Sequence, residues 1–127
     1  MNLFSRLIFF ALIALMAFAA EAADITGNWK ATITTASGPR SYTYVFRQDG
    51  GKLIGTIKSD AGVVAIEDGY INNKTITFSE NITVEGRRAL VDYMGELVSD
   101  TEIRFTRQAA GTTSPAVAFV AVRTGPN

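Results

Sequence analysis

The chain offers few residues for catalysis, because it contains no histidine and no cysteine. These absences remove the usual ligands of zinc and copper and the commonest general base. A carboxylate in apolar surroundings is the remaining candidate for general acid or base work near neutral pH. Glu80, assisted by Tyr42 or Tyr93, is the favoured candidate. Asp68 lies in a strand whose register a predicted bulge shifts, and Asp92 is expected to face water. No spacing is specific for a reaction, so catalysis is the least favoured function, with no metal or cofactor predicted.

A second set of side chains suits binding. Aromatic rings provide apolar area, and an arginine at the edge of a pocket can pair with a carboxylate or phosphate. A small apolar or amphipathic molecule needs this combination. The same rings could instead fill the interior completely, with the charged groups forming a solvated ion-pair cluster. The predicted ligand-binding residues are Arg40, Tyr42, Tyr44, Phe78, Glu80, Tyr93, Phe105, Arg107 and Phe119, with Arg87 and Arg88 on an adjacent turn.

The first 22 residues are typical of a signal peptide. Arg6 precedes an uninterrupted apolar stretch from Leu7 to Ala20, and Ala20-Glu21-Ala22 fits signal peptidase, which predicts cleavage after Ala22. The apolar stretch is shorter than the ~20 residues that span a bilayer, which disfavours an uncleaved anchor. We therefore expect a periplasmic or secreted protein whose only membrane contact precedes cleavage, with residues 23–127 forming one domain.

Charge and composition narrow the partners further. Lys and Arg number 12, as do Asp and Glu, and no long run of one sign occurs. Neither nucleic acid nor a polyanionic surface is therefore predicted as a partner. Without cysteine, the exported domain must be held by packing and hydrogen bonds alone.

Residues after 23 show the period-two alternation of strands, interrupted by turn residues at short intervals. Short connections favour a meander, and eight strands close most economically as an antiparallel up-and-down barrel without exposed edges. A two-sheet sandwich is the alternative. Asp68-Gly69 predicts a bulge in the fourth strand. The predicted strands are 28–35, 40–48, 52–59, 63–71, 74–83, 88–98, 102–108 and 116–123.

Alternation also predicts which side chains face the interior. Several outward positions are apolar, and these could form a homodimer face: Val45, Ile54, Leu90, Met94, Val120 and Val122. The predicted inward set is Trp29, Ala31, Ile33, Tyr42, Tyr44, Phe46, Leu53, Gly55, Ile57, Ile76, Phe78, Val91, Tyr93, Gly95, Leu97, Ile103, Phe105, Val117, Phe119 and Ala121.

Gly27-x-Trp29 in the first strand, paired with Arg123 in the last, resembles the calycin group, which includes lipocalins, fatty-acid-binding proteins and avidins. The resemblance implies that Trp29 plugs the floor of the barrel and that Arg123 packs over its ring. The resemblance extends over the architecture of residues 23–127 but over only these three residues in motif. The stretch resembling Thr-Asp-Tyr that many lipocalins carry is absent.

This floor assigns the ends of the barrel. The turns near 49–51, 72–73 and 99–101 then lie at the floor, and longer loops near 36–39, 60–62, 84–87 and 108–115 surround a mouth. The favoured function is an exported protein that holds a small apolar or amphipathic molecule in its lumen. The first alternative is an interaction protein with a filled barrel, such as an inhibitor of a secreted enzyme. The second is an enzyme using Glu80.

Overall fold

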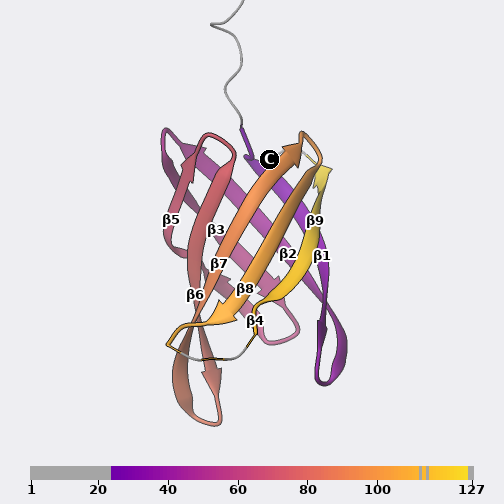
Figure 1. Ribbon diagram of the computed structural model, residues 1–127, viewed down its shortest axis with the longest axis vertical. Helices are drawn as coiled ribbons and strands as arrows, with labels where there is room; N and C mark the ends of the chain where they lie inside the picture. Colours follow the sequence, from indigo (N-terminus) through magenta and orange to yellow (C-terminus); the bar gives the residue numbers. More distant parts are fainter. Residues whose placement is uncertain (1–23, 112, 114, 126–127) are drawn as a thin grey trace, which may run out of the picture.

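The computed structural model describes residues 24–111, 113 and 115–125, and the predicted signal peptide lies outside them. The described residues form nine β-strands (Figure 1). No helix among them is long and apolar enough to cross a membrane. The strands are β1 (Gly27–Thr35), β2 (Gly38–Asp49), β3 (Lys52–Ser59), β4 (Gly62–Ala65), β5 (Glu67–Asn72), β6 (Thr75–Val84), β7 (Arg87–Ser99), β8 (Glu102–Ala109) and β9 (Val117–Gly125).

The strands close into an antiparallel barrel, as predicted. Consecutive strands pair as neighbours, except that β4 and β5 both pair with β3. β1 also pairs with β9, so the sheet returns on itself. The fourth position is shared by β4 and β5, which gives an eight-stranded closed barrel. Closure satisfies backbone hydrogen bonds on both sides of each strand. The fold is compatible with that of the calycins.

The predicted fourth strand is divided by a local irregularity. Both β4 and β5 pair with β3, and Ile66 lies between them with its amide bonded to the Gly55 carbonyl. The pairing of β5 with β6 shifts between Glu67 and Tyr70, and Asp68 has a φ of 51°. This confirms the predicted bulge. Asp tolerates the left-handed conformation better than a bulky residue, because its short side chain can bond locally.

The core is a set of inward side chains that pack on one another. Nearly all predicted inward residues are buried, but Tyr42 and Gly55 are half-buried, and Val117 is 39% exposed because it lies at the open end. Six rings form the centre, with centroids 4.4–6.3 Å apart in the contacting pairs. Such close spacing leaves the middle of the barrel filled. The rings belong to Tyr44, Phe46, Phe78, Tyr93, Phe105 and Phe119.

One end of the barrel is sealed by Trp29 and Arg123, which do meet. The guanidinium carbon lies 4.5 Å from the centre of the indole ring. Its nitrogens donate to the carbonyls of Asp100, Thr26 and Asp24 at 2.7–2.9 Å. The indole nitrogen of Trp29 donates to the carbonyl of Ile25, whose side chain is fully buried. The segment before β1 is thereby tied across this end.

The opposite end is the mouth, but its loops differ from the prediction. The turns after β1, β3 and β6 each hold two residues, like the floor turns, and only the connection from 110 to 116 is longer. At this end it is the strands, not the loops, that are extended. The β1–β2 and β6–β7 hairpins extend past their neighbours at the lower end of Figure 1. Glu85 and Gly86, with φ values of 52° and 78°, suit the tight turn between β6 and β7.

Candidate binding site at the barrel mouth

Four polar side chains meet inside the barrel on its mouth side. The Tyr93 hydroxyl donates to a Glu80 carboxylate oxygen at 2.8 Å. An Arg107 nitrogen lies 4.0 Å from the same oxygen, with the two side chains only 15% and 6% exposed. The Arg107 guanidinium carbon lies 5.4 Å from the ring centres of both Tyr42 and Tyr93. The two rings and the carboxylate offset part of the hydration that the buried cation has lost.

The strand register explains why these side chains converge. Tyr93 of β7 pairs with Arg107 of β8 on one side and with Phe78 of β6 on the other. Glu80 is two residues further along β6 than Phe78, on the same face and nearer the mouth. Tyr42 of β2 is the residue on the mouth side of Tyr44 on the inward face. Three adjacent strands and the opposite wall therefore contribute to one polar cluster.

Tyr44 adds a hydroxyl without a hydrogen bond to this cluster. Its side chain is fully buried, and its hydroxyl has no hydrogen-bond partner in the described part of the chain. Burial has the largest effect on the pKa of Tyr44, but the adjacent Tyr93 hydroxyl lowers this pKa, as does the charge of Arg107, while Glu80 raises it. These influences place the Tyr44 hydroxyl beside the polar cluster. A buried hydroxyl without a partner typically costs about 1–3 kcal/mol. Such an atom calls for a physical explanation, and one explanation is a bound ligand whose oxygen atom accepts a hydrogen bond from it.

Burial dominates the acid–base behaviour of the phenols. Desolvation raises the pKa of Tyr44 and of Tyr93 well above the ordinary 10.0, and the carboxylate of Glu80 raises both further. Desolvation alone would lower the pKa of Arg107, but interactions with Tyr93, Tyr42 and Glu80 outweigh it and raise the pKa. Both tyrosines are thus neutral hydrogen-bond donors at physiological pH, and Arg107 is a fixed cation.

Apolar side chains surround the polar cluster at the mouth. Val64 lies opposite the buried Ile57, and Val117 opposite Arg107, so both have inward register. They are nevertheless 36% and 39% exposed. Ile66 and Ile82 pack against the core but are only partly buried. We call Val64, Ile66, Ile82 and Val117 the apolar collar. Inward apolar groups that remain in contact with water show that this end is open to solvent.

The predicted ligand-binding residues separate into three groups. The rings of Tyr44, Phe78, Tyr93, Phe105 and Phe119 are buried together, and Tyr42, Glu80 and Arg107 join Tyr93 in the polar cluster. Arg40 does not join it, because its guanidinium pairs with Asp60 of the β3–β4 turn at 3.0 Å and remains exposed. Arg87 and Arg88, on the mouth-side β6–β7 hairpin, are exposed. Asp92 is exposed, as its alternation predicts, and so is Asp68.

Sequence reasoning missed three of the four collar residues. Val64 lies in Gly62-Val63-Val64-Ala65, where no alternation of apolar and polar residues can be read. Ile66 follows at the break between β4 and β5. Counting forward from Ile57 through the two-residue turn after β3 would have identified Val64 as inward, because it pairs with Ile57 across this hairpin. Ile82 has the same parity as Glu80 but was not included in the predicted inward set.

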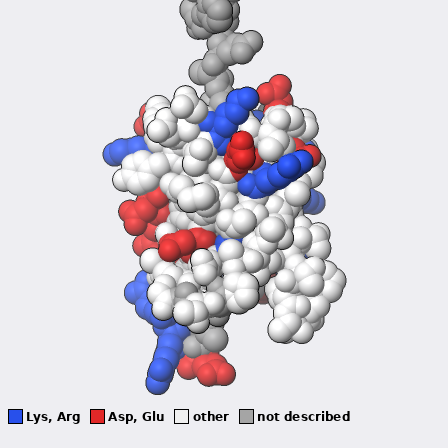
Figure 2. Space-filling model, in the orientation of Figure 1, with Lys and Arg blue, Asp and Glu red and all other residues white. Residues whose placement is uncertain are grey.

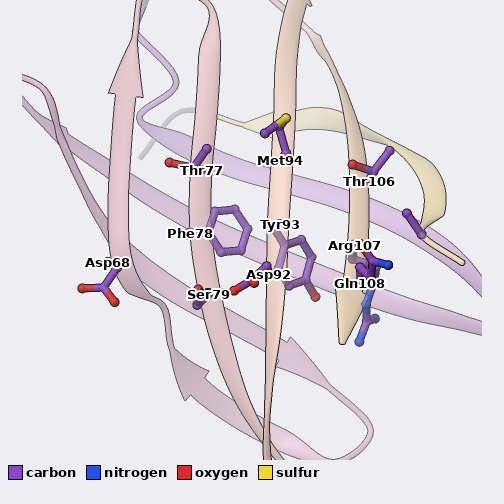
Figure 3. A pocket seen from close by; sticks show the side chains of 11 residues that line it. Asp68, Thr77, Phe78, Ser79, Asp92, Tyr93, Met94, Thr106, Arg107 and Gln108 are labelled. Carbon is purple, nitrogen blue, oxygen red and sulfur yellow. Dashed lines mark hydrogen bonds between the residues drawn. The ribbon is translucent and has the colours of Figure 1, made fainter. Parts of the chain in front are cut away.

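A hollow of about 510 Å³ lies over β6, β7 and β8, lined by outward side chains and also by Phe78, Tyr93 and Arg107. Figure 3 shows Thr77, Met94 and Thr106 in one row across these strands, and Ser79, Asp92 and Gln108 in the next. These are the outward positions, and the Ser79 hydroxyl donates to Asp92 at 2.8 Å. The hollow therefore belongs to the outer surface. Within the described ranges, no three His, Cys, Asp or Glu residues gather closely enough to hold a metal ion.

The outward apolar residues do not form one continuous face. Val45 and Ile54 lie on β2 and β3, Val120 and Val122 on β9, and Leu90 and Met94 on β7. The strands between these pairs, β1 and β8, present outward charged and hydroxyl side chains such as Lys30, Thr32, Arg104 and Thr106. Figure 2 likewise shows basic and acidic groups distributed among uncharged ones over the visible face. A homodimer through these residues remains a prediction.

No known protein-family model matches this chain, and no curated protein matches it in sequence.

Proposed function

We propose that this protein is an exported, calycin-like barrel that binds a small apolar or amphipathic molecule at its mouth. The carrying observation is the apolar collar, whose inward valines stay in contact with water around a buried polar cluster. An apolar body of a ligand would cover the collar, and its polar end would meet Tyr42, Tyr44, Tyr93 and Arg107. Because packed rings occupy the middle of the barrel, the ligand lies above them rather than deep in the lumen.

Burial of the collar would provide the driving force. Each valine covered by a ligand contributes at about 25 cal/mol per Å² of apolar surface removed from water. Export is inferred from the predicted signal peptide in residues 1–22 and not from the barrel itself.

Native mass spectrometry of the protein purified from the organism that makes it tests this function. We expect a stoichiometric adduct that is lost on denaturation. Val64→Asp, which places a carboxylate in the collar, should abolish the adduct. Val63→Asp is the matched control, because Val63 is the neighbouring residue with outward register and 62% exposure. An adduct that survives Val64→Asp but not Val63→Asp would contradict a site in the mouth.

An interaction protein is the second candidate, favoured by the filled centre and by the two hairpins that extend past the barrel. Such a protein, for example an inhibitor of a secreted enzyme, would bind its partner through the hairpin ends. Arg88→Glu in the β6–β7 hairpin should then abolish capture of a secreted protein while Val64→Asp leaves it intact. Catalysis by Glu80 has no geometric observation in its favour, since its carboxylate already serves Tyr93 and Arg107.

A further inference from the structure

We propose that the mouth selects a neutral molecule carrying a hydrogen-bond acceptor, such as a ketone, amide or ether oxygen, and that the Tyr44 hydroxyl is its anchor. This inference rests on the proposed function and specifies the chemical class of its ligand. It differs from the expectation drawn from sequence, in which Arg40 or Arg107 pairs with an anion.

The charge of the polar cluster is already balanced, and so is that of Arg40 near it. Arg107 lies against Glu80 in a largely buried pair, and Arg40 lies against Asp60 at the surface. An anionic group entering the cluster would meet the Glu80 carboxylate in surroundings of low polarity, where repulsion between like charges is poorly screened. A cation would meet Arg107 under the same conditions. Neutral groups avoid both costs, so the pairing selects against charge of either sign.

The hydrogen bonds of the cluster then specify an acceptor. The Tyr93 hydroxyl already donates its hydrogen bond to Glu80. Tyr44 is the buried donor without a hydrogen bond among the described residues. Because desolvation raises its pKa, this phenol keeps its proton at any physiological pH. A ligand oxygen that accepts a hydrogen bond from this phenol would remove the free-energy cost of the unpaired hydroxyl, which a purely apolar ligand cannot do.

Access to Tyr44 is controlled by Tyr42. The Tyr42 ring stacks on that of Tyr44, with centroids 6.4 Å apart, and lies one inward position closer to the mouth. Tyr42 is only half-buried, so its ring lies between solvent and Tyr44, with the Arg107 guanidinium carbon 5.4 Å from its centre. A ligand seated in the collar would reach the Tyr44 hydroxyl by displacing this ring.

Two fluorescent probes of similar size test the inference: Prodan, a neutral naphthyl ketone, and anilinonaphthalene sulfonate, an anion. We expect the wild-type protein to bind the ketone at least tenfold more tightly than the sulfonate. Tyr44→Phe should weaken ketone binding by roughly five- to tenfold, the value of one hydrogen bond. Tyr70→Phe is the matched control, since Tyr70 is exposed on β5. Glu80→Gln leaves the charge of Arg107 unbalanced and should reduce the preference for the ketone at least tenfold.

A measurement without ligand makes the test independent of the probes. Removing an unpaired buried hydroxyl should raise the thermal unfolding temperature, so we expect Tyr44→Phe to unfold a few degrees higher than wild type. Tyr93→Phe removes a donor from the buried Glu80 carboxylate and should unfold lower. If Tyr44→Phe unfolds as low as Tyr93→Phe, its hydroxyl has a partner and the inference is overturned.

The outcomes separate this inference from the proposed function. Equal affinity for ketone and sulfonate, or ketone binding unaffected by Tyr44→Phe, overturns the inference; if Val64→Asp still abolishes probe binding, the function stands. A wild-type protein that binds neither probe and carries no adduct overturns the function itself.

Discussion

Replacing Arg123 tests whether the last strand is fastened to the segment that precedes the first. The guanidinium donates to three backbone carbonyls at 2.7–2.9 Å and covers the Trp29 ring at 4.5 Å. Two of these bonds are solvent-exposed, so about 1 kcal/mol each is appropriate, and the contact with the ring adds about 0.5–1 kcal/mol. Arg123→Ala should therefore lower the free energy of unfolding by about 3 kcal/mol, or the unfolding temperature by roughly 12 °C or more.

Two companion variants separate geometry from charge. Arg123→Lys keeps a cation over Trp29 but cannot reach three carbonyls at once, so it should still lose about 2 kcal/mol. Arg104→Ala is the control, because that side chain is 70% exposed and pairs with nearby Glu102, and should change stability by less than about 0.5 kcal/mol.

Guanidinium unfolding followed by far-ultraviolet circular dichroism is the appropriate assay. Trp29 is the single tryptophan, and its fluorescence would report loss of the overlying cation as well as unfolding. Full stability in Arg123→Lys would show that charge alone matters, and a loss below about 1 kcal/mol in Arg123→Ala would refute the fastening role.

Two further perturbations test backbone packing and the buried phenols. Gly55→Ala would press a methyl group against the Val45 carbonyl, so the β2–β3 pairing must open and thermal unfolding should occur at least about 8 °C lower; Gly51→Ala, which meets only an ordinary contact, should match wild type. Because the folded pKa of Tyr44 and Tyr93 is raised above 10.0, their contribution to stability is complete below about pH 10 and falls as the pH rises. Urea unfolding between about pH 8 and pH 11 measures this fall, which should be smaller in Tyr93→Phe, and an identical fall in both proteins would contradict it.

The barrel could be predicted because the features that define its strands lie within short stretches of the sequence. Alternation and turn residues place strand ends within one or two residues of those observed, apart from the divided fourth strand. The bulge could be located from Asp68-Gly69, because few other pairs tolerate that backbone. The meeting of Trp29 and Arg123 was predictable only through the calycin resemblance, since the two residues lie at opposite ends of the domain.

The site was predicted less completely because it depends on distances across the barrel. Parity indicated that Tyr42, Tyr44, Glu80, Tyr93 and Arg107 point inward. It could not show that Glu80 and Arg107 neutralise each other, or that the rings touch at 4.4–6.3 Å and fill the centre. Those facts follow from the way β2 faces β6, β7 and β8 across the interior after closure. The alternation of residues along a strand does not indicate the distance between strands on opposite sides of the barrel.

By itself, then, the sequence determined the alternation, the turns and the direction in which most side chains point, because each depends on backbone geometry within a few residues. Tertiary structure alone decided which carboxylate meets which arginine, which hydroxyl is left without a partner, and which valines remain wet at the mouth. The physical reason is that closure brings residues from distant strands into a fixed volume, where packing and hydrogen bonding are settled jointly rather than strand by strand.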